Sequence, residues 1–399
     1  MAPLAPGPGR LLIVPNVLAT LAADDTVLVV AIVAARLLVP LLIPRFPLVI
    51  IAALVLDAVD NSVLAQFTDV DLSPDGPYQS WDKALDIYYL AIAYLSTMRN
   101  WTSDAAFRIC QFLFYYRLVG VVLFELLASR SMLLIFPNTF EYFFIAYELI
   151  RLRFDPARVT ARFWLLVAVV LWVVVKLPQE YWIHIAQRDM TDTIVETPFV
   201  GVALAVVGIA AIAVLLLVVR PALGTPTWGW RFAADRLPTA AGDAHRRHAE
   251  ELRRGRVAVG ELLEKAALLA LLCIIFASIL PSIGASPLQV TIGVALIVAA
   301  NAAISMGFVL REHVGVASAT ARFGALVGVN LVLVFVANLV LTDDDDFQLG
   351  SGLFFAFLIT LIIWLYDVYK PTYDARFEGS PLGVTSVSDL SRRIWHPIP

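Results

Sequence analysis

Apolar runs of about twenty residues recur along most of the chain, separated by short polar stretches. A helix needs about 20 apolar residues to cross the hydrocarbon core of a bilayer, where its backbone groups must be satisfied internally. The pattern therefore predicts an all-α, polytopic transmembrane helix bundle of about eleven spans. We place these spans at 26–44, 46–66, 79–98, 106–129, 131–152, 161–189, 197–220, 258–280, 287–310, 321–342 and 350–369.

Composition supports a membrane protein and excludes several other classes. The 399 residues are 60% hydrophobic and only 16% charged, whereas soluble domains carry about 25% charged residues. A soluble enzyme, a disordered chain and a nucleic-acid binder are thereby excluded, and the lipid bilayer is the first expected partner. The preference for Arg over Lys, with much Ala, Val and Leu, favours a bacterial protein of the cytoplasmic membrane. Cys110 and Cys273 lie in apolar runs and indicate neither a disulfide framework nor a cysteine metal site.

The charges of the loops alternate along the chain. Arg45, Arg99, Arg151 and the arginines of the 221–257 loop mark one set of loops, while Asp69–Asp75 and Asp343–Asp346 mark the other set as acidic. Because cytoplasmic loops are enriched in Lys and Arg, the N-terminus is expected outside and the C-terminus in the cytoplasm. The 221–257 loop divides the chain. The expected parts are an interfacial segment 1–25, a polar-lined bundle 26–196, a linking span 197–220, a basic cytoplasmic loop 221–257, an apolar bundle 258–370 and a cytoplasmic tail 371–399.

Charged residues within the predicted spans are concentrated in spans two to six. A charge inside a membrane span costs about 2.5–3.5 kcal/mol on insertion scales, so such a cluster indicates function. The expected topology places most of these side chains in the outer leaflet. We therefore expect a charged cavity that is open to the extracytoplasmic side.

Four aspartates form the sharpest pattern in these spans. Asp60 follows Asp57 by three positions and Asp86 follows Asp82 by four, so each pair shares one face of its helix. Carboxylates on two neighbouring helices suit a hard divalent cation, which is the candidate cofactor. In the alternative interpretation, Asp82 lies at the membrane surface with Lys83, and Asp86 pairs with an arginine.

The spacing Asp57-x-x-Asp60 and Asp82-x-x-x-Asp86 resembles the aspartate motif of the CDP-alcohol phosphotransferases. Asn61 stands where that family has a glycine, Leu64-Ala65 where it has Ala-Arg, and Tyr78 where it has the later glycine. The expected topology also places this loop outside, away from CDP-linked donors. We therefore do not assign the chain to that family.

Spans four to six supply a second set of polar residues. Lys176, Glu180, His184 and Arg188 repeat every four residues on span six, Pro178 is expected to kink this span, and Phe136-Pro137-Asn138 is expected to kink or break span five. The expected substrate- or proton-binding residues are Arg117, Glu125, Asn138, Glu141, Lys176, Glu180 and His184.

These patterns favour cation- or proton-linked transport of a small solute or ion. The alternative is a membrane-embedded, metal-dependent enzyme that acts on a lipid-linked or envelope substrate from the outer face. Its catalytic candidates are Glu180, His184, Arg188 and Arg117, with Glu180 or His184 as base and an arginine gripping an anionic group. A third interpretation is a receptor or assembly scaffold that uses the same cavity for binding alone.

Overall fold

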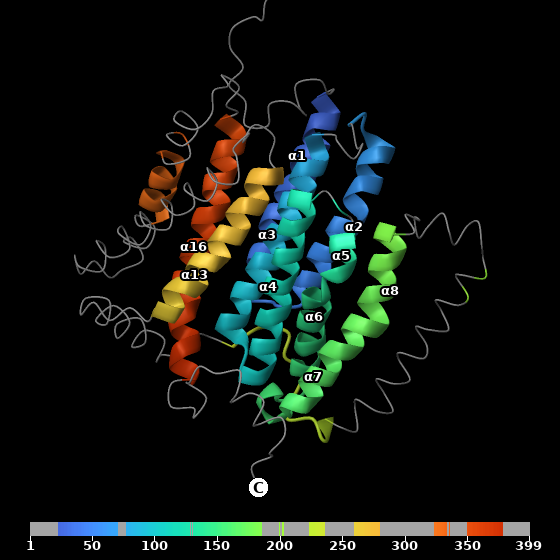
Figure 1. Cartoon of the computed structure of the whole chain (residues 1–399), viewed down its shortest axis with the longest axis vertical. Coiled ribbons are helices and arrows are strands. Elements are labelled where there is room, and N and C mark those ends of the chain that lie inside the picture. The colour runs from blue at the N-terminus through green and yellow to red at the C-terminus, as the bar shows by residue number, and fades with distance from the viewer. Residues whose placement is uncertain are drawn as a thin grey trace, which may run out of the picture. The chain divides into compact units, whose positions relative to one another are not determined.

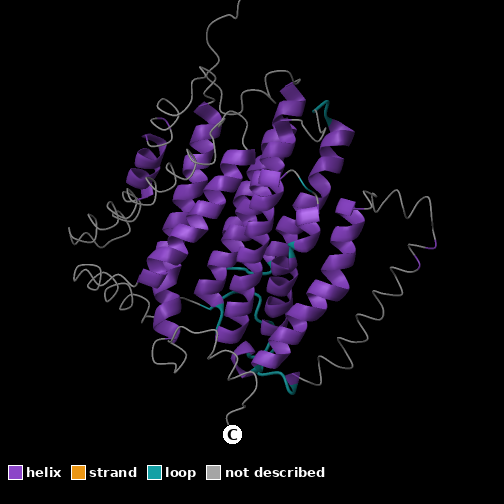
Figure 2. Cartoon of the chain, viewed as in Figure 1, coloured by secondary structure: helices purple, strands orange, loops and turns teal. Residues whose placement is uncertain are grey.

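The computed structural model describes residues 23–70, 77–127, 131–185, 223–235, 259–279, 323–332 and 349–377, together with the single residues 129, 199, 202 and 335. Every regular element in these ranges is a helix, and none of the described residues lies in a strand (Figure 2). The predicted all-helical class is confirmed for this part of the chain.

The chain forms two compact units, each drawn from three separate stretches. The first unit comprises Met1–Leu41, Ala52–Ile92 and Gly242–Val368, and the second comprises Leu42–Ile51, Ala93–Ala241 and Tyr369–Pro399. The helices α2 (Val49–Phe67), α3 (Pro77–Asn100) and α16 (Leu349–Phe377) contribute residues to both units.

The first unit also contains α1 (Ala23–Leu38), α13 (Val259–Ile279) and the helix Phe323–Val332. Val29 of α1, Leu64 of α2 and Tyr78 of α3 form a buried apolar cluster. α13 and α16 lie side by side (Figure 1), joined by an ion pair of 2.5 Å between Lys265 Nζ and Asp367 Oδ1.

The second unit is centred on α4 (Asp104–Leu127), which packs against α5 (Ser131–Ile135), α6 (Thr139–Arg151) and α7 (Ala161–Val170). From α7 the chain continues through a π-helical turn, η3 (Leu171–Lys176), a short α8 (Leu177–Glu180) and a second π-helical turn, η4 (Tyr181–Ile185). The 3₁₀ helices η1 (Val39–Leu42) and η2 (Pro156–Arg158) lie in connections.

Four of the described helical segments are long and apolar enough to cross a membrane. They are Val49–Phe67, Asp104–Leu127, Ser131–Arg151 and Ala161–Glu180, which fall on the second, fourth, fifth and sixth predicted spans. Val27–Leu42 and Phe323–Val332 are shorter apolar helices. The predicted spans 197–220 and 287–310 lie outside the continuous described ranges. These helices fit an integral membrane protein.

Several arginine-bearing loops meet at one end of the second unit. Arg45 Nη1 donates to the carbonyl oxygen of Ala234 at 2.6 Å, and Arg99 Nη1 donates to that of Pro44 at 2.7 Å. The backbone N–H of Arg231 donates to the carbonyl oxygen of Leu152 at 3.0 Å. Loops that the sequence assigns to one side of the membrane are therefore joined by hydrogen bonds.

Candidate functional site

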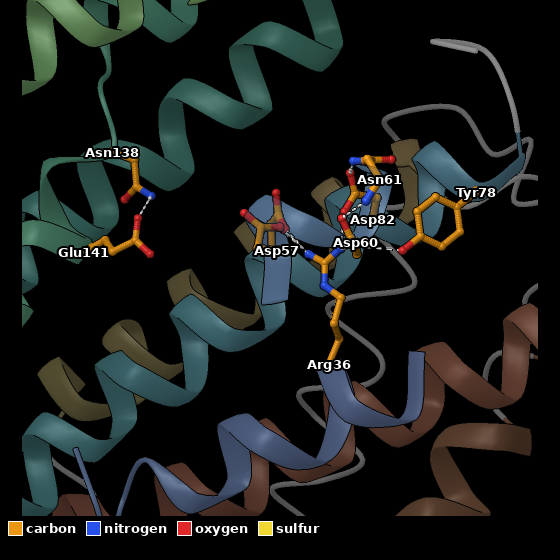
Figure 3. A network of polar contacts seen from close by, with 9 residues as sticks. Arg36, Asp57, Asp60, Asn61, Tyr78, Asp82, Asn138 and Glu141 are labelled. Atoms are coloured by element: carbon orange, nitrogen blue, oxygen red, sulfur yellow. Dashed lines mark hydrogen bonds and ion pairs between the residues drawn. The ribbon is translucent and has the colours of Figure 1, made fainter. Parts of the chain in front are cut away.

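The predicted aspartate cluster forms in the first unit, around the guanidinium of Arg36. This arginine lies in the last turn of α1 and is only 4% exposed. Its Nη1 pairs with Asp60 and Asp82, and its Nη2 pairs with Asp57 and Asp86. Figure 3 shows the side chain reaching from α1 toward the carboxylates. One cation thus ties α1 to two other helices.

Helical periodicity explains why these carboxylates face a single point. Residues three or four positions apart lie on one face of a helix, so α2 and α3 each present two aspartates to Arg36. Asp60 receives two further hydrogen bonds, from the hydroxyl of Tyr78 at 2.8 Å and from the backbone N–H of Asn61 at 2.6 Å (Figure 3). These hydrogen bonds and the ion pair with Arg36 satisfy the Asp60 carboxylate, which is only 2% exposed.

The charges of this Arg36 cluster do not balance. Four carboxylates surround one guanidinium, so the fully ionised group carries a net charge of 1 − 4 = −3. Ligand oxygens of Asp57, Asp82 and Asp86 lie within 4.8 Å of one another. Oxygens bound to one Ca²⁺ or Mg²⁺ have a comparable spacing, so this donor set suits a hard divalent cation. The guanidinium of Arg36 already faces the same oxygens.

Arg36 is the member of this cluster that the spacing of the aspartates does not predict. Arg36 lies within an apolar run, and a charge there opposes insertion of the run into a membrane. This isolated charge is the sequence signal that could have identified it. One part of the alternative interpretation of the aspartates agrees with the structure, because Asp86 pairs with an arginine.

A second polar cluster lies in the second unit, around Lys176 at the end of η3. Lys176 and Glu180 are 5% and 4% exposed, and Lys176 Nζ lies 3.6 Å from Glu180 Oε1. Lys176 Nζ also donates to Gln179 Oε1 at 3.1 Å and lies 4.4 Å from the centre of the Tyr142 ring. The lysine is therefore held by a carboxylate, an amide oxygen and an aromatic face.

Glu180 is in addition bonded to the start of α6. The backbone N–H of Asn138, the N-cap of that helix, donates to Glu180 Oε1 at 3.2 Å. A carboxylate is favoured there by the free N–H groups and the positive end of the helix dipole. The side chain of Asn138 donates instead to Glu141 Oε2 at 3.1 Å, and its Oδ1 is buried without a hydrogen-bond partner (Figure 3).

Both helices that carry this Lys176 cluster are irregular. The predicted break at Phe136-Pro137-Asn138 is present, because it separates α5 from α6. Pro178 lies between two π-helical turns, and the N–H of Leu177 donates to the carbonyl oxygen of Trp172. A proline removes a backbone donor, and π turns occur frequently at functional sites.

The remaining predicted site residues are placed as follows. Arg117 on α4 donates through Nη1 to the carbonyl of Phe136 at 3.2 Å, and its Nε is buried without a hydrogen-bond partner. Glu125 lies two turns further along α4 and is partly exposed. The backbone of His184 belongs to η4, whereas Arg188 lies outside the described residues. The Arg36 and Lys176 clusters belong to different units, so the single shared cavity stays a prediction.

Glu148 on α6 has a hydrogen-bond partner for each of its two carboxylate oxygens. It is 1% exposed, and it accepts hydrogen bonds from Trp101 Nε1 at 2.9 Å and from Arg151 Nε at 2.5 Å. Tyr147 stacks on Trp101 with ring centres 3.7 Å apart. These contacts indicate a structural ion pair.

No family model matches the chain, and no curated protein or solved structure matches it either.

Proposed function

We propose that this protein is a bacterial cytoplasmic-membrane transporter that couples the movement of a small solute or ion to protons or cations. The proposal includes eleven spans, an outer N-terminus and a cytoplasmic C-terminus, as the loop charges predict. The lipid bilayer and the transported solute or ion are its partners.

The observation that carries the proposal is the buried Lys176–Glu180 pair beside the broken α5–α6 segment. Ionisable residues within apolar helices commonly mark ion pathways and proton relays. Non-helical backbone at membrane depth is tolerated where it is buried in protein or lines an aqueous cavity. Transporters often bind their cargo at such discontinuous helices.

Glu180 is the proposed proton carrier. Its carboxylate lies 3.6 Å from Lys176 Nζ and accepts a hydrogen bond from the N–H of Asn138 at the start of α6. Uptake of a proton would remove the charge of the carboxylate and weaken its hold on the start of α6. Lys176 and Arg117 would then be available to an anionic group of the solute. Asn138 Oδ1 would accept a hydrogen bond from the solute, while Glu141, Glu125 and His184 complete the proposed site.

The Arg36 cluster is the proposed cation-binding element of the transporter. Its net charge of 1 − 4 = −3 is neutralised by protons or by a bound cation. Because Arg36 bridges α1 to α2 and α3, a change in bound positive charge would alter the strength of that bridge. This links cation binding to the relative positions of helices within the first unit.

Electrometry on liposomes adsorbed to a solid support tests the proposal. The purified protein is exposed to steps of pH, Na⁺ and Mg²⁺, and empty liposomes provide the baseline. We expect a protein-dependent current with at least one of these ions. The control Asp235→Asn, whose side chain is 79% exposed, should retain the current. A response equal to that of empty liposomes for all three ions would contradict ion-linked transport.

The second candidate function is a metal-dependent enzyme that acts on a lipid-linked or envelope substrate. The three clustered carboxylates of Asp57, Asp82 and Asp86 favour it. A divalent cation there would supply Lewis-acid activation. Glu180, His184, Arg188 and Arg117 remain its proposed catalytic residues. Tight binding of Mn²⁺ by the wild-type protein, without any ion-driven current, would support this function over transport.

A further inference from the structure

The segment 223–235 is fixed to the end of α6 in the second unit. The N–H of Thr227 donates to the carbonyl of Arg153 at 2.9 Å, and Trp228 Nε1 donates to that of Arg151 at 3.0 Å. The N–H of Arg231 donates to the carbonyl of Leu152 at 3.0 Å. Gly224, with φ of +72°, adopts the left-handed conformation that glycine tolerates. The loop thus has a defined shape.

This anchored loop exposes two large aromatic side chains. Trp230 and Phe232 are 63% and 60% exposed, and their rings stack with centres 6.1 Å apart and an interplanar angle of 10°. Aromatic side chains of this kind are enriched where a membrane meets water. The loop is bonded to the end of Ser131–Arg151, a segment long and apolar enough to cross a membrane. The N–H of Asp155, in the connection that leads to the second such segment, Ala161–Glu180, donates to Thr227 Oγ1 at 3.2 Å.

Two arginines lie against the aromatic rings of the loop. Arg153 Cζ lies 5.1 Å from the centre of the Trp230 ring, and Arg231 Cζ lies 4.2 Å from that of Trp228. Arg153 Nε is buried without a hydrogen-bond partner, and the cationic guanidinium that carries it lies over the Trp230 ring. Arg231 Nη1 lies 3.6 Å from Asp235 Oδ1, and both side chains of this pair are exposed. A phosphate offers the acceptor geometry that guanidinium groups match best.

We propose that Trp228–Phe232 and Arg153 form a binding surface for anionic phospholipid at the membrane interface. The two arginines bind the headgroup phosphate, while Trp230 and Phe232 enter the boundary between headgroups and acyl chains. Charge complementarity selects an anionic lipid. The exposed ring pair favours a lipid over free phosphate, because inorganic phosphate gives those rings no apolar environment. This surface is independent of any transported solute.

Lipid-dependent thermal unfolding tests the arginines. The wild-type protein in detergent is titrated with dioleoylphosphatidylglycerol, dioleoylphosphatidylcholine or inorganic phosphate. We expect phosphatidylglycerol to raise Tm more than the other two, and Arg153→Gln/Arg231→Gln to lose at least about half of that rise. Arg158→Gln, whose side chain is 75% exposed in the neighbouring connection, should keep it. An equal response to both lipids, or the same response to inorganic phosphate alone, would overturn the proposal.

A fluorescent label tests the depth of the aromatic face. In a background of Cys110→Ala and Cys273→Ala, an environment-sensitive dye is attached through Trp230→Cys, with Ala157→Cys as the control position. Nanodiscs of phosphatidylglycerol with a shallow nitroxide lipid should quench the dye at 230 more strongly than the dye at 157. Quenching by aqueous iodide but not by the nitroxide lipid would overturn insertion. Protection from both quenchers would indicate a protein partner and would equally overturn it.

Discussion

Arg36 and Asp60 form an ion pair whose side chains are only 3% and 1% exposed, and the hydroxyl of Tyr78 donates to the same carboxylate at 2.8 Å. α1 is therefore joined to α2 and α3 by charge as well as by the apolar cluster of Val29, Leu64 and Tyr78. Removing one partner of a buried ion pair leaves an uncompensated charge, which is strongly destabilising.

Arg36→Gln should lower the free energy of unfolding by about 3–5 kcal/mol, because four carboxylates lose their shared cation. Thermal unfolding in detergent measures the change. Asp60→Asn added to Arg36→Gln should restore part of the stability, since it removes one of the unpaired charges. Arg158→Gln is the surface control. An unchanged Tm for Arg36→Gln would show that the cluster does not hold α1.

The same substitution should increase the affinity for divalent cations. Without the guanidinium, the oxygens of Asp57, Asp82 and Asp86 are free for a metal, so Arg36→Gln should bind Mn²⁺ at least about tenfold more tightly than wild type. Titration followed by the electron paramagnetic resonance signal of free Mn²⁺ measures this affinity. Adding Asp82→Asn should reverse the gain. Equal affinities for wild type and Arg36→Gln would mean that Arg36 does not compete with a cation.

Gly120→Ala should disturb the packing of α4 against the non-helical segment that separates α5 from α6. A Cβ at Gly120 would lie 2.1 Å from Cβ of Phe136, so the break would have to move, at a cost of about 1–3 kcal/mol. Gly328→Ala is the matched control, because a Cβ there meets nothing within 4 Å. The control should be neutral or stabilised by up to about 1 kcal/mol. The same Tm for both variants in thermal unfolding would contradict the close contact between Gly120 of α4 and Phe136.

Glu148→Gln should separate structural from functional carboxylates. It removes the charge that faces Arg151, whose guanidinium cannot lose its proton, so we expect a loss of about 3–5 kcal/mol of stability. Ion flux per folded molecule should stay near the wild-type value. Thermal unfolding and flux normalised to folded protein provide the two readings. Normal stability combined with lost flux would place Glu148 in the pathway instead.

Much of the Arg36 cluster could be predicted from the sequence, since helical spacing alone places Asp57 with Asp60 and Asp82 with Asp86. Their common partner could not be identified in the same way. Arg36 is 21 residues before Asp57, and its choice of partner depends on how α1 packs against α2 and α3. The charge within an apolar run indicates that a partner is needed, but not which one.

In the Lys176 cluster, too, some features could be predicted from local sequence and others depend on tertiary contacts. Pro137 predicts the interruption of span five, because proline cannot continue a regular helix. Pro178 has the same local signal, and here the backbone changes to π-helical turns on both sides of the proline. The bond from the Asn138 N–H to Glu180 joins residues 42 positions apart, and local sequence carries no information on such a contact.

We propose that Glu180 carries the transported or coupling proton. Glu180→Gln keeps the size of the side chain, and Lys176 retains Gln179 and the Tyr142 ring as partners, so the variant should fold with nearly normal Tm. Lysine can also release its proton when it loses its counter-charge.

Proton entry into liposomes loaded with a pH-sensitive dye, driven by a potassium diffusion potential, tests the claim most directly. We predict acidification with the wild-type protein and with the Asp235→Asn control, and only the rate of empty liposomes with Glu180→Gln. A folded Glu180→Gln variant that acidifies the liposomes at the wild-type rate would contradict the account.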